Sequence, residues 1–332
     1  MELIPTHRRG IDVTWNCNIH CNFCYHKYKP QKHDLLLEDI KNSILSAKAA
    51  GNNYVDLVGP GEPSMHLSIV EIIKYIKQQD MRVCLNTNAI ISERKLTDIL
   101  EAGIDDFLIS FHGLEKTHDT TVDLEGARKV QEKSIKCILS YGKTFRTNTV
   151  INNQNYFELP ELASYLSNLP ARIVNFINFN PHGEWSGNEN SLNFVTNLRI
   201  VEPLLNDAID ILEKYGIGVN VRYYPMCRIR EDLRKNVCND LQVMFDPYEW
   251  DYSITPKTIA TYKSHGETIS NTIESKVGVC ASCGIKRICG GINKQYDIFT
   301  NYTQTDNIIC NNEDLSDIFY YRKNNGKVFE II

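Results

Sequence analysis

The chain has 332 residues, 42% of them hydrophobic and 23% charged, a composition typical of soluble globular proteins. Its 36 Lys and Arg residues against 41 Asp and Glu give a net charge of −5, without a basic stripe to follow phosphates, which argues against a nucleic-acid substrate. No stretch is long and apolar enough to span a membrane, and residues 1–10 lack the apolar segment of a secretory signal, so a cytoplasmic protein is expected.

Strands and helices are predicted to alternate over the first 190 residues. Short apolar runs predict strands, and apolar residues recurring at intervals of three and four predict helices. The predicted strands are 11–15, 54–59, 82–87, 106–112, 146–151 and 173–179, and the predicted helices are 37–50, 67–79, 92–103, 124–142 and 157–169. Six βα units in order imply a parallel sheet, so we expect an α/β fold, a partial (β/α)6 TIM-like barrel. Its ligand site should lie at the carboxyl ends of the strands.

The alternation stops after residue 190. An amphipathic helix at about 194–216 and a strand at 218–224 predict a connecting unit over 191–225. Residues 226–332 have little periodicity and contain several cysteines. We therefore predict a barrel over 1–190, the connecting unit, and a small irregular α+β domain over 226–332 that is ordered partly by metal.

Eleven cysteines are spread unevenly along the chain. In a cytoplasmic protein they should be reduced thiols, not a disulfide framework. Cys84 and Cys137 fall in apolar patterns, where we expect small buried side chains. The others gather near the two ends, except for Cys227 and Cys238.

The segment CNIHCNFC (17–24) places three cysteines on one loop directly after the first strand. A structural metal site is closed by four ligands, whereas three ligands leave a position for a molecule that binds and departs. Thiolates favour zinc or an iron–sulfur cluster. A [4Fe–4S] cluster on Cys17, Cys21 and Cys24 would keep one iron open, with Phe23 excluding water. The alternative is a zinc site completed by His20 or a distant residue.

This loop resembles the C-x3-C-x-Φ-C motif of the radical S-adenosylmethionine (SAM) superfamily, which follows the first strand of a partial barrel. Five further strand ends resemble motifs of that family in order: GPGEP (59–63), NTNA (86–89), SFHG (110–113), FRTNTVINNQN (145–155) and NFNPHG (178–183). The resemblance implies that the open iron binds SAM, and that one electron from a flavodoxin- or ferredoxin-type donor cleaves it. The resulting 5′-deoxyadenosyl radical would abstract hydrogen from the substrate.

The resemblance also implies contacts to SAM. Glu62 and the carbonyls around Gly59 and Gly61 suit the methionine ammonium, with Pro60 replacing a usual glycine. Arg146 would pair with the carboxylate, unless it is an ordinary surface arginine. Ser110 and Asn148 would form hydrogen bonds to the ribose or the carboxylate, and Asn180 would lie near the adenine. The expected SAM-binding residues are therefore Phe23, Gly59, Gly61, Glu62, Thr87, Ser110, Arg146, Asn148 and Asn180.

CASCGIKRICGG (280–291) has the spacing C-x2-C-x5-C and resembles the SPASM extension of radical SAM enzymes. The resemblance implies an auxiliary [4Fe–4S] cluster on Cys280, Cys283, Cys289 and Cys310, with structural zinc as the alternative. No standard second auxiliary cluster is expected, because Asn293 stands where the family has a further cysteine. Cys227 and Cys238 are open to three interpretations: ligands of an incomplete cluster, a catalytic thiol, or structural residues, the last being favoured for Cys238.

The resemblance implies an enzyme of oxidoreductase or lyase type without fixing its substrate. A ribosomally made peptide that is cross-linked, epimerised or oxidised is expected. The chain starts about ten residues before the first strand, so no leader-recognition domain is expected. Alternatives are a small molecule, such as an aminoglycoside or nucleoside, and a non-enzymatic zinc or electron-transfer protein. His112 and His182 are either acid/base candidates or structural histidines. Residues 242–254, which are rich in aromatic and acidic side chains, either line a substrate entrance or pack within the second domain.

Overall fold

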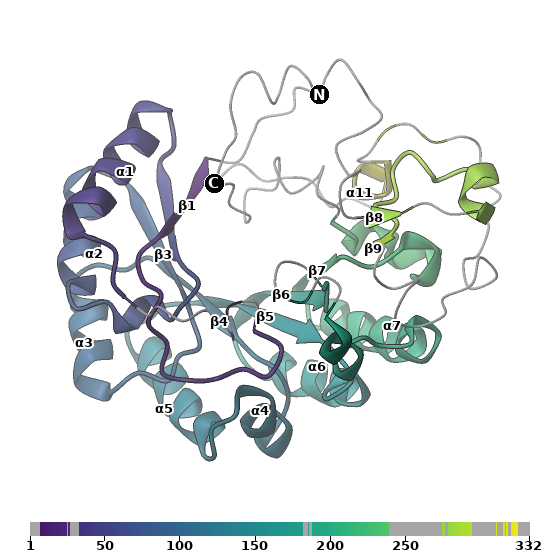
Figure 1. Cartoon of the computed structure of the whole chain (residues 1–332), viewed down its shortest axis with the longest axis horizontal. Helices are drawn as coiled ribbons and strands as arrows, with labels where there is room; N and C mark the ends of the chain where they lie inside the picture. The colour runs from purple at the N-terminus through teal and green to yellow at the C-terminus, as the bar shows by residue number, and fades with distance from the viewer. Residues whose placement is uncertain are drawn as a thin grey trace.

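One curled parallel sheet, with helices on its outer side, organises the chain in a computed structural model (Figure 1). The structure describes residues 7–24, 26, 33–181, 185, 188–238, 274–275, 278–293, 310, 315, 317 and 320–324. The predicted partial barrel is confirmed, and its strands lie in chain order from β1 to β7.

The sheet contains seven parallel strands, one more than the six βα units predicted for the barrel. They are β1 (Arg8–Asp12), β2 (Tyr54–Val58), β3 (Arg82–Thr87), β4 (Asp106–Ser110), β5 (Phe145–Ile151), β6 (Ala171–Asn178) and β7 (Gly218–Arg222). β7 was predicted in the connecting unit, yet it pairs with β6 from Ile173–Gly218 to Ile177–Arg222. This strand therefore extends the barrel wall.

Helices join consecutive strands and follow the outer side of the sheet (Figure 1). The main ones are α1 (Leu37–Ala49), α2 (Ile69–Gln78), α3 (Glu93–Glu101), α4 (Glu115–Val122), α5 (Ala127–Ser140), α6 (Leu159–Ser167) and α7 (Leu198–Lys214). All of these helices except α4 were predicted from the sequence. α4 ends at Val122, and α5 begins at Ala127 as a separate helix. The apolar periodicity of these helices is explained by the core that they form with the sheet.

The two faces of the sheet differ in chemistry because alternate side chains of a strand point to opposite sides. Val55 and Leu57 of β2 and Phe107 and Ile109 of β4 join the helices in the main core. The alternate positions face the barrel interior and are largely polar. On this inner face only a small apolar cluster separate from the main core is found among the described residues, and it consists of Tyr54, Cys84 and Leu108. The interior is therefore suited to a polar ligand.

The described part of the C-terminal region packs against the barrel beyond β7. It contains the short antiparallel strands β8 (Glu274–Ser275) and β9 (Ile292–Asn293) and the helix α11 (Tyr320–Asn324). Ile285, Ile288 and Tyr321 join the same core as Met226 and Leu233. The C-terminal cysteines are thus carried by segments that share the core of the barrel.

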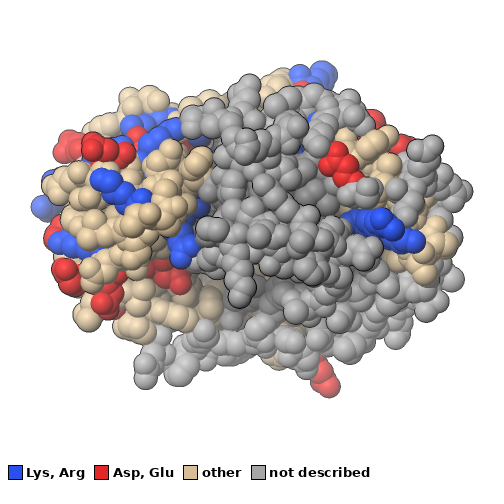
Figure 2. All heavy atoms as spheres, turned by 90° about the horizontal axis from the view of Figure 1, so that it is seen from above, with Lys and Arg blue, Asp and Glu red and all other residues tan. Residues whose placement is uncertain are grey.

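The described surface has mixed charge. Figure 2 shows Lys and Arg side chains interspersed with Asp and Glu on the described part of one face. Within the part of the chain that the structure describes, no helix has the length and apolar character to cross a membrane.

Candidate active site

The cysteine loop, residues 17–24, leaves the carboxyl end of β1 and lies against the end of β2. Gly61 N donates to Thr14 O (3.1 Å) and Glu62 N donates to Asn16 O (2.7 Å). A Cβ on Gly59 would come within 2.8 Å of Thr14 O, and one on Gly61 would overlap the Asn16 carbonyl. Both glycines are therefore needed for the close approach of the two loops.

The end of β3 forms a second support for the cysteine loop. Asn88 Nδ2 donates to Asn18 Oδ1 (2.8 Å), and Asn18 Nδ2 donates to Ile90 O (2.7 Å). Glu62 joins this support because its carboxylate accepts hydrogen bonds from Thr87 Oγ1 (2.6 Å) and Asn88 N (2.7 Å). The loops after β1, β2 and β3 are thus connected by side-chain amides and one carboxylate.

Glu62 is buried, and its carboxylate also accepts from Ser64 N (3.1 Å). Burial raises its pKa, and the hydrogen bonds from Thr87, Asn88 and Ser64 partly oppose that rise. The sequence assigned Glu62 and Thr87 to SAM. In the structure the Thr87 hydroxyl donates to the Glu62 carboxylate, so both side chains are already engaged. The acceptors that remain for an ammonium are the backbone carbonyls of the loop after β2.

A third support comes from α4, which the sequence did not predict. His20 N donates to Val122 O (3.2 Å), Asn22 N donates to Thr121 O (2.9 Å), and Asn22 Nδ2 donates to Thr120 O (2.8 Å). These carbonyls lie in the last turn of the helix, where intrahelical donors run out, and that of Thr120 also accepts from Asp123 N (3.3 Å). The helix end and the cysteine loop therefore satisfy each other's backbone groups.

Trp185 forms the fourth support, and nothing in the sequence analysis pointed to it. Its indole is buried, and Nε1 donates to the carbonyls of Phe23 (3.0 Å) and Cys24 (3.1 Å). On its other side, Phe23 meets the edge of His112 with ring centroids 4.8 Å apart. Cys24 and the phenylalanine before it are thus fixed from β4 and from the segment after β6.

His112 is buried beside His118, and the two rings are stacked 6.1 Å apart. Nδ1 of His112 accepts from Val150 N (3.3 Å), and Nδ1 of His118 accepts from His112 N (3.2 Å). Burial lowers the pKa of each ring to about 3. Both rings are therefore held neutral, which fits the structural interpretation of His112 better than the acid/base one. His182 and residues 242–254 lie outside the described residues.

The three loop thiols are of the ligand type that an iron–sulfur cluster takes. All three are partly exposed, and burial raises the pKa of Cys21, with Cys24 and Cys17 raising it further. A bound cation would reverse this effect by stabilising the thiolates. Among the described residues, no three His, Cys, Asp or Glu side chains are grouped as for a single metal ion. This does not bear on a four-iron cluster, whose cysteine ligands each bind a different iron. His20, the ligand considered for the zinc alternative, is exposed.

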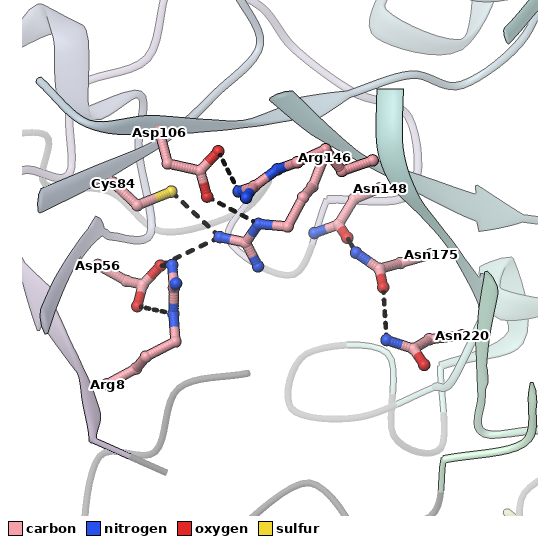
Figure 3. Close-up of polar contacts among 9 residues, drawn as sticks. Arg8, Asp56, Cys84, Asp106, Arg146, Asn148, Asn175 and Asn220 are labelled. Carbon is pink, nitrogen blue, oxygen red and sulfur yellow. Dashed lines mark hydrogen bonds and ion pairs between the residues drawn. The ribbon is translucent and has the colours of Figure 1, made fainter. Parts of the chain in front are cut away.

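Ser110 and Asn148 face the barrel interior on neighbouring strands and are partly exposed. Asn148 Oδ1 accepts from Asn175 Nδ2 (2.9 Å), which leaves the amide NH2 group directed away from that bond (Figure 3). Asn180 is buried just after β6. Of the polar SAM candidates, Ser110 and Asn148 are therefore the two whose side chains line the interior with partial exposure.

Arg146 lies elsewhere than expected. Its side chain is 1% exposed, Nε donates to Asp106 (3.0 Å), and Nη2 lies 3.5 Å from Asp56 and 3.3 Å from Cys84 Sγ (Figure 3). Arg8 completes the network with a two-point pair to Asp56. The surface alternative for Arg146 is wrong, because the guanidinium is buried and enclosed by carboxylates at the barrel floor. The same ion pairs engage the guanidinium that was expected to pair with the SAM carboxylate.

The C-terminal cysteines come together beside the barrel. Burial raises the pKa of Cys310 to about 11, Arg234 opposes that rise, and Cys283 and Cys289 add to it. Arg234 Nη2 donates to Cys310 Sγ (3.2 Å). Two backbone amides, those of Met226 and Gly291, donate to Cys289 Sγ at 3.4 Å each. Cys280 lies one turn before Cys283, which donates its N–H to Cys280 O (3.2 Å).

The two remaining cysteines lie on the segment after β7. Cys238 is buried, and its N–H donates to Val221 O (2.8 Å). Cys227 is partly buried against the main core.

Residues 11–166 match the sequence model of the Radical SAM superfamily. This match covers slightly less than half of the chain. The range contains the cysteine loop and five of the seven strands, β1 to β5, the first of them from its fourth residue. The motif resemblance in the N-terminal half is thereby confirmed.

Curated relatives point to several activities. The chain is 25% identical over 177 residues to a probable GTP 3′,8-cyclase of Methanococcus maripaludis, covering 52% of this chain and 59% of the cyclase. It is 21% identical over 267 residues to a tungsten-containing aldehyde ferredoxin oxidoreductase cofactor-modifying protein of Pyrococcus furiosus, covering 77% of this chain and 72% of that protein. The chain thus spans about three-fifths of the length of that cyclase.

Solved structures show the same fold. SuiB of Streptococcus suis bound to S-adenosylmethionine superposes with a TM-score of 0.59 at 16% identity, over 86% of this chain and 72% of SuiB. anSMEcpe with bound AdoMet and the Kp18Cys peptide gives 0.52 at 15% identity, over 65% of this chain and 64% of that one. The likeness to the SuiB fold extends beyond residues 11–166.

Proposed function

We propose that the chain is a radical SAM enzyme that modifies a peptide. The main support is the position of the cysteine loop, which the segments after β2 and β3, the end of α4 and Trp185 hold at the barrel mouth. Cys17, Cys21 and Cys24 would hold a [4Fe–4S] cluster with one iron open to SAM. When bound, that cluster supplies an electron to cleave SAM to a 5′-deoxyadenosyl radical, which takes hydrogen from the substrate.

The protein's own contribution is orientation and exclusion of water. The backbone carbonyls around Gly59 and Gly61 would receive the methionine ammonium, because the Glu62 carboxylate is engaged by Thr87 and Asn88. Ser110 and Asn148 would donate to SAM oxygens from the inner face. Phe23, packed against His112, would shield the cluster side from solvent.

A peptide substrate is supported by the fold likeness to SuiB, also solved with its precursor peptide SuiA, and to anSMEcpe with a peptide. A small-molecule substrate is the second candidate, because the curated GTP 3′,8-cyclases match the same barrel segment. The C-terminal cysteines favour the peptide candidate, since their C-x2-C-x5-C spacing resembles the SPASM extension. An auxiliary [4Fe–4S] cluster on Cys280, Cys283, Cys289 and Cys310 is part of the proposal.

The test is anaerobic reconstitution with iron and sulfide, followed by iron analysis and incubation with dithionite and SAM. The wild-type chain should hold about eight irons and form 5′-deoxyadenosine. Cys24→Ala should lose about four irons and all 5′-deoxyadenosine, and Cys310→Ala should lose iron but retain the N-terminal cluster. Cys137→Ala, at a partly exposed cysteine on α5, is the matched control and should behave as wild type. Zinc in place of iron at the N-terminal thiols would refute the proposal.

The substrate class is tested by the origin of hydrogen in 5′-deoxyadenosine. Deuterium from a perdeuterated peptide digest should appear in that product, whereas GTP should be recovered unchanged. Consumption of GTP without deuterium transfer from peptides would replace the peptide candidate with the small-molecule one.

A further inference from the structure

A line of hydrogen-bonded side chains crosses the inner face from the C-terminal helix to the middle of the sheet. Arg322 Nη2 on α11 donates to Asn220 Oδ1 (3.2 Å), Asn220 Nδ2 donates to Asn175 Oδ1 (3.2 Å), and Asn175 Nδ2 donates to Asn148 Oδ1 (2.9 Å). Figure 3 shows the three asparagines side by side on neighbouring strands. We call Asn148, Asn175 and Asn220 the asparagine ladder.

The ladder follows from the register of the sheet. Asn148 is the register partner of Asn175, and Asn175 is the partner of Asn220. Three amides at one level of parallel strands lie close enough to bond in sequence. Asn175, Asn220 and Arg322 are buried, whereas Asn148 is partly exposed. The ladder therefore has a closed end at Arg322 and an open end at Asn148.

Every bond in this line runs in the same direction. Each amide oxygen accepts, each NH2 group donates to the next residue, and a guanidinium stands at the start. Aligned hydrogen bonds in a buried setting polarise one another. Among the described residues, nothing accepts a hydrogen bond from Asn148 Nδ2. The Asn148 NH2 group is therefore a polarised donor that faces the barrel interior, beside Ser110, which is the register partner of Asn148.

The helix that carries Arg322 also contacts the C-terminal cysteine group. Tyr321, the preceding residue, accepts a hydrogen bond at its hydroxyl from Arg234 Nη1 (2.8 Å). The other end of the Arg234 guanidinium donates to Cys310 Sγ (3.2 Å). Two consecutive residues of α11, Tyr321 and Arg322, therefore connect the cysteine group to the closed end of the ladder.

We propose that Arg322 is a positioning residue for SAM, acting through the asparagine ladder to fix Asn148 as a donor to a SAM oxygen. This inference rests on the proposed function. The donor end suits an acceptor, and SAM offers acceptors in its carboxylate and ribose hydroxyl oxygens. If the Asn148 amide turned over, its oxygen would face SAM and its NH2 would face the Asn175 NH2. Arg322 prevents this because its donors fix the orientation of all three amides.

The test measures the Kd of SAM for the fully reconstituted chain by equilibrium dialysis, together with the SAM-dependent change in the EPR spectrum of the reduced N-terminal cluster. Arg322→Met and Asn148→Ala should each raise the Kd about tenfold. Arg322→Lys should recover most of the affinity, because an ammonium can still donate to Asn220. The double variant Arg322→Met with Asn148→Ala should bind SAM no more weakly than Asn148→Ala alone, since both changes remove the same contact.

Arg230→Met is the matched control, because that arginine is half-exposed and pairs with Asp210 and Asp232 outside the ladder. It should leave the Kd unchanged. If Arg322→Met fails to fold, Asn148→Ala at the exposed end still tests the contact. Wild-type affinity in either Arg322→Met or Asn148→Ala would overturn the inference while the proposed function stands. A wild-type chain with both clusters and no SAM binding would overturn both.

Discussion

The two ends of the barrel interior are built from different polar groups. At the floor, Arg8, Asp56, Asp106 and Arg146 form a network of full charges (Figure 3). Toward the mouth, the centre of the inner face carries the neutral groups of Ser110 and the asparagine ladder, and among the described strand residues charged ones stand only at its two sides, Asp12 on β1 and Arg222 on β7. The charges at the floor neutralise one another and leave little for a ligand, whereas a neutral amide can keep a donor for one. This contrast separates the part of the interior that stabilises the fold from the part suited to binding.

The largest effect is expected at the floor. Arg146→Met would leave the carboxylates of Asp106 and Asp56 buried with fewer cations, and should lower the free energy of unfolding by about 3–5 kcal/mol. Chemical denaturation of the cluster-free chain measures this loss. The matched control is Arg172→Met, because Arg172 pairs with the same Asp106 but is 35% exposed, and its loss should be below about 1 kcal/mol. Equal losses for the two variants would contradict the comparison.

The second prediction concerns the histidines beside the mouth. The folded pKa of His118 is about 3, below the unfolded value of about 6.5, so protonation favours the unfolded chain. Stability should be full above pH 6.5 and should fall as the pH drops toward 3. In His118→Gln, which keeps an acceptor for His112 N, denaturation curves at pH 7.5 and pH 5 should differ by about 2 kcal/mol less than in wild type. The same acid loss in both proteins would show that His118 is not held neutral.

The third prediction concerns the contribution of Trp185 to the stability of the cysteine loop. Trp185→Phe keeps an aromatic ring but removes the N–H that donates to Phe23 O and Cys24 O, which should loosen the loop by about 1 kcal/mol. The alkylation rate of Cys24 in the cluster-free chain should then rise about fivefold. Cys137 on α5 serves as the internal reference, and its rate should not change. A Cys24 rate equal to that of wild type would remove Trp185 from the supports of the loop.

Features that depend on local sequence were predictable, and those that depend on distant contacts were not. Five of the six predicted barrel strands lie within two residues of their observed ends, whereas the first was predicted at 11–15 and lies at Arg8–Asp12. The buried ion pair of Arg146 was not predicted because its partner Asp106 is 40 residues away and is reached only through the register of the sheet. Trp185 was missed because the carbonyl it binds is 162 residues away. α4 was missed because its sequence, EKTHDTTV, has low helical propensity and gains its stability from the fold.

The smallest effect is expected at Ala89, the last residue of the NTNA segment at the mouth. Ala89 adopts a left-handed conformation with φ of +57°, held by a hydrogen bond from its N–H to Thr87 Oγ1 (2.9 Å). Because alanine is strained there and glycine is not, Ala89→Gly should raise the free energy of unfolding by about 0.5–1 kcal/mol in chemical denaturation. Ala102→Gly, at a right-handed helix end with φ of −68°, should instead be neutral or destabilising. A gain at Ala102 equal to that at Ala89 would mean that the effect does not come from the backbone of the mouth. A gain at Ala89 alone would show that the backbone at the mouth is strained at this residue.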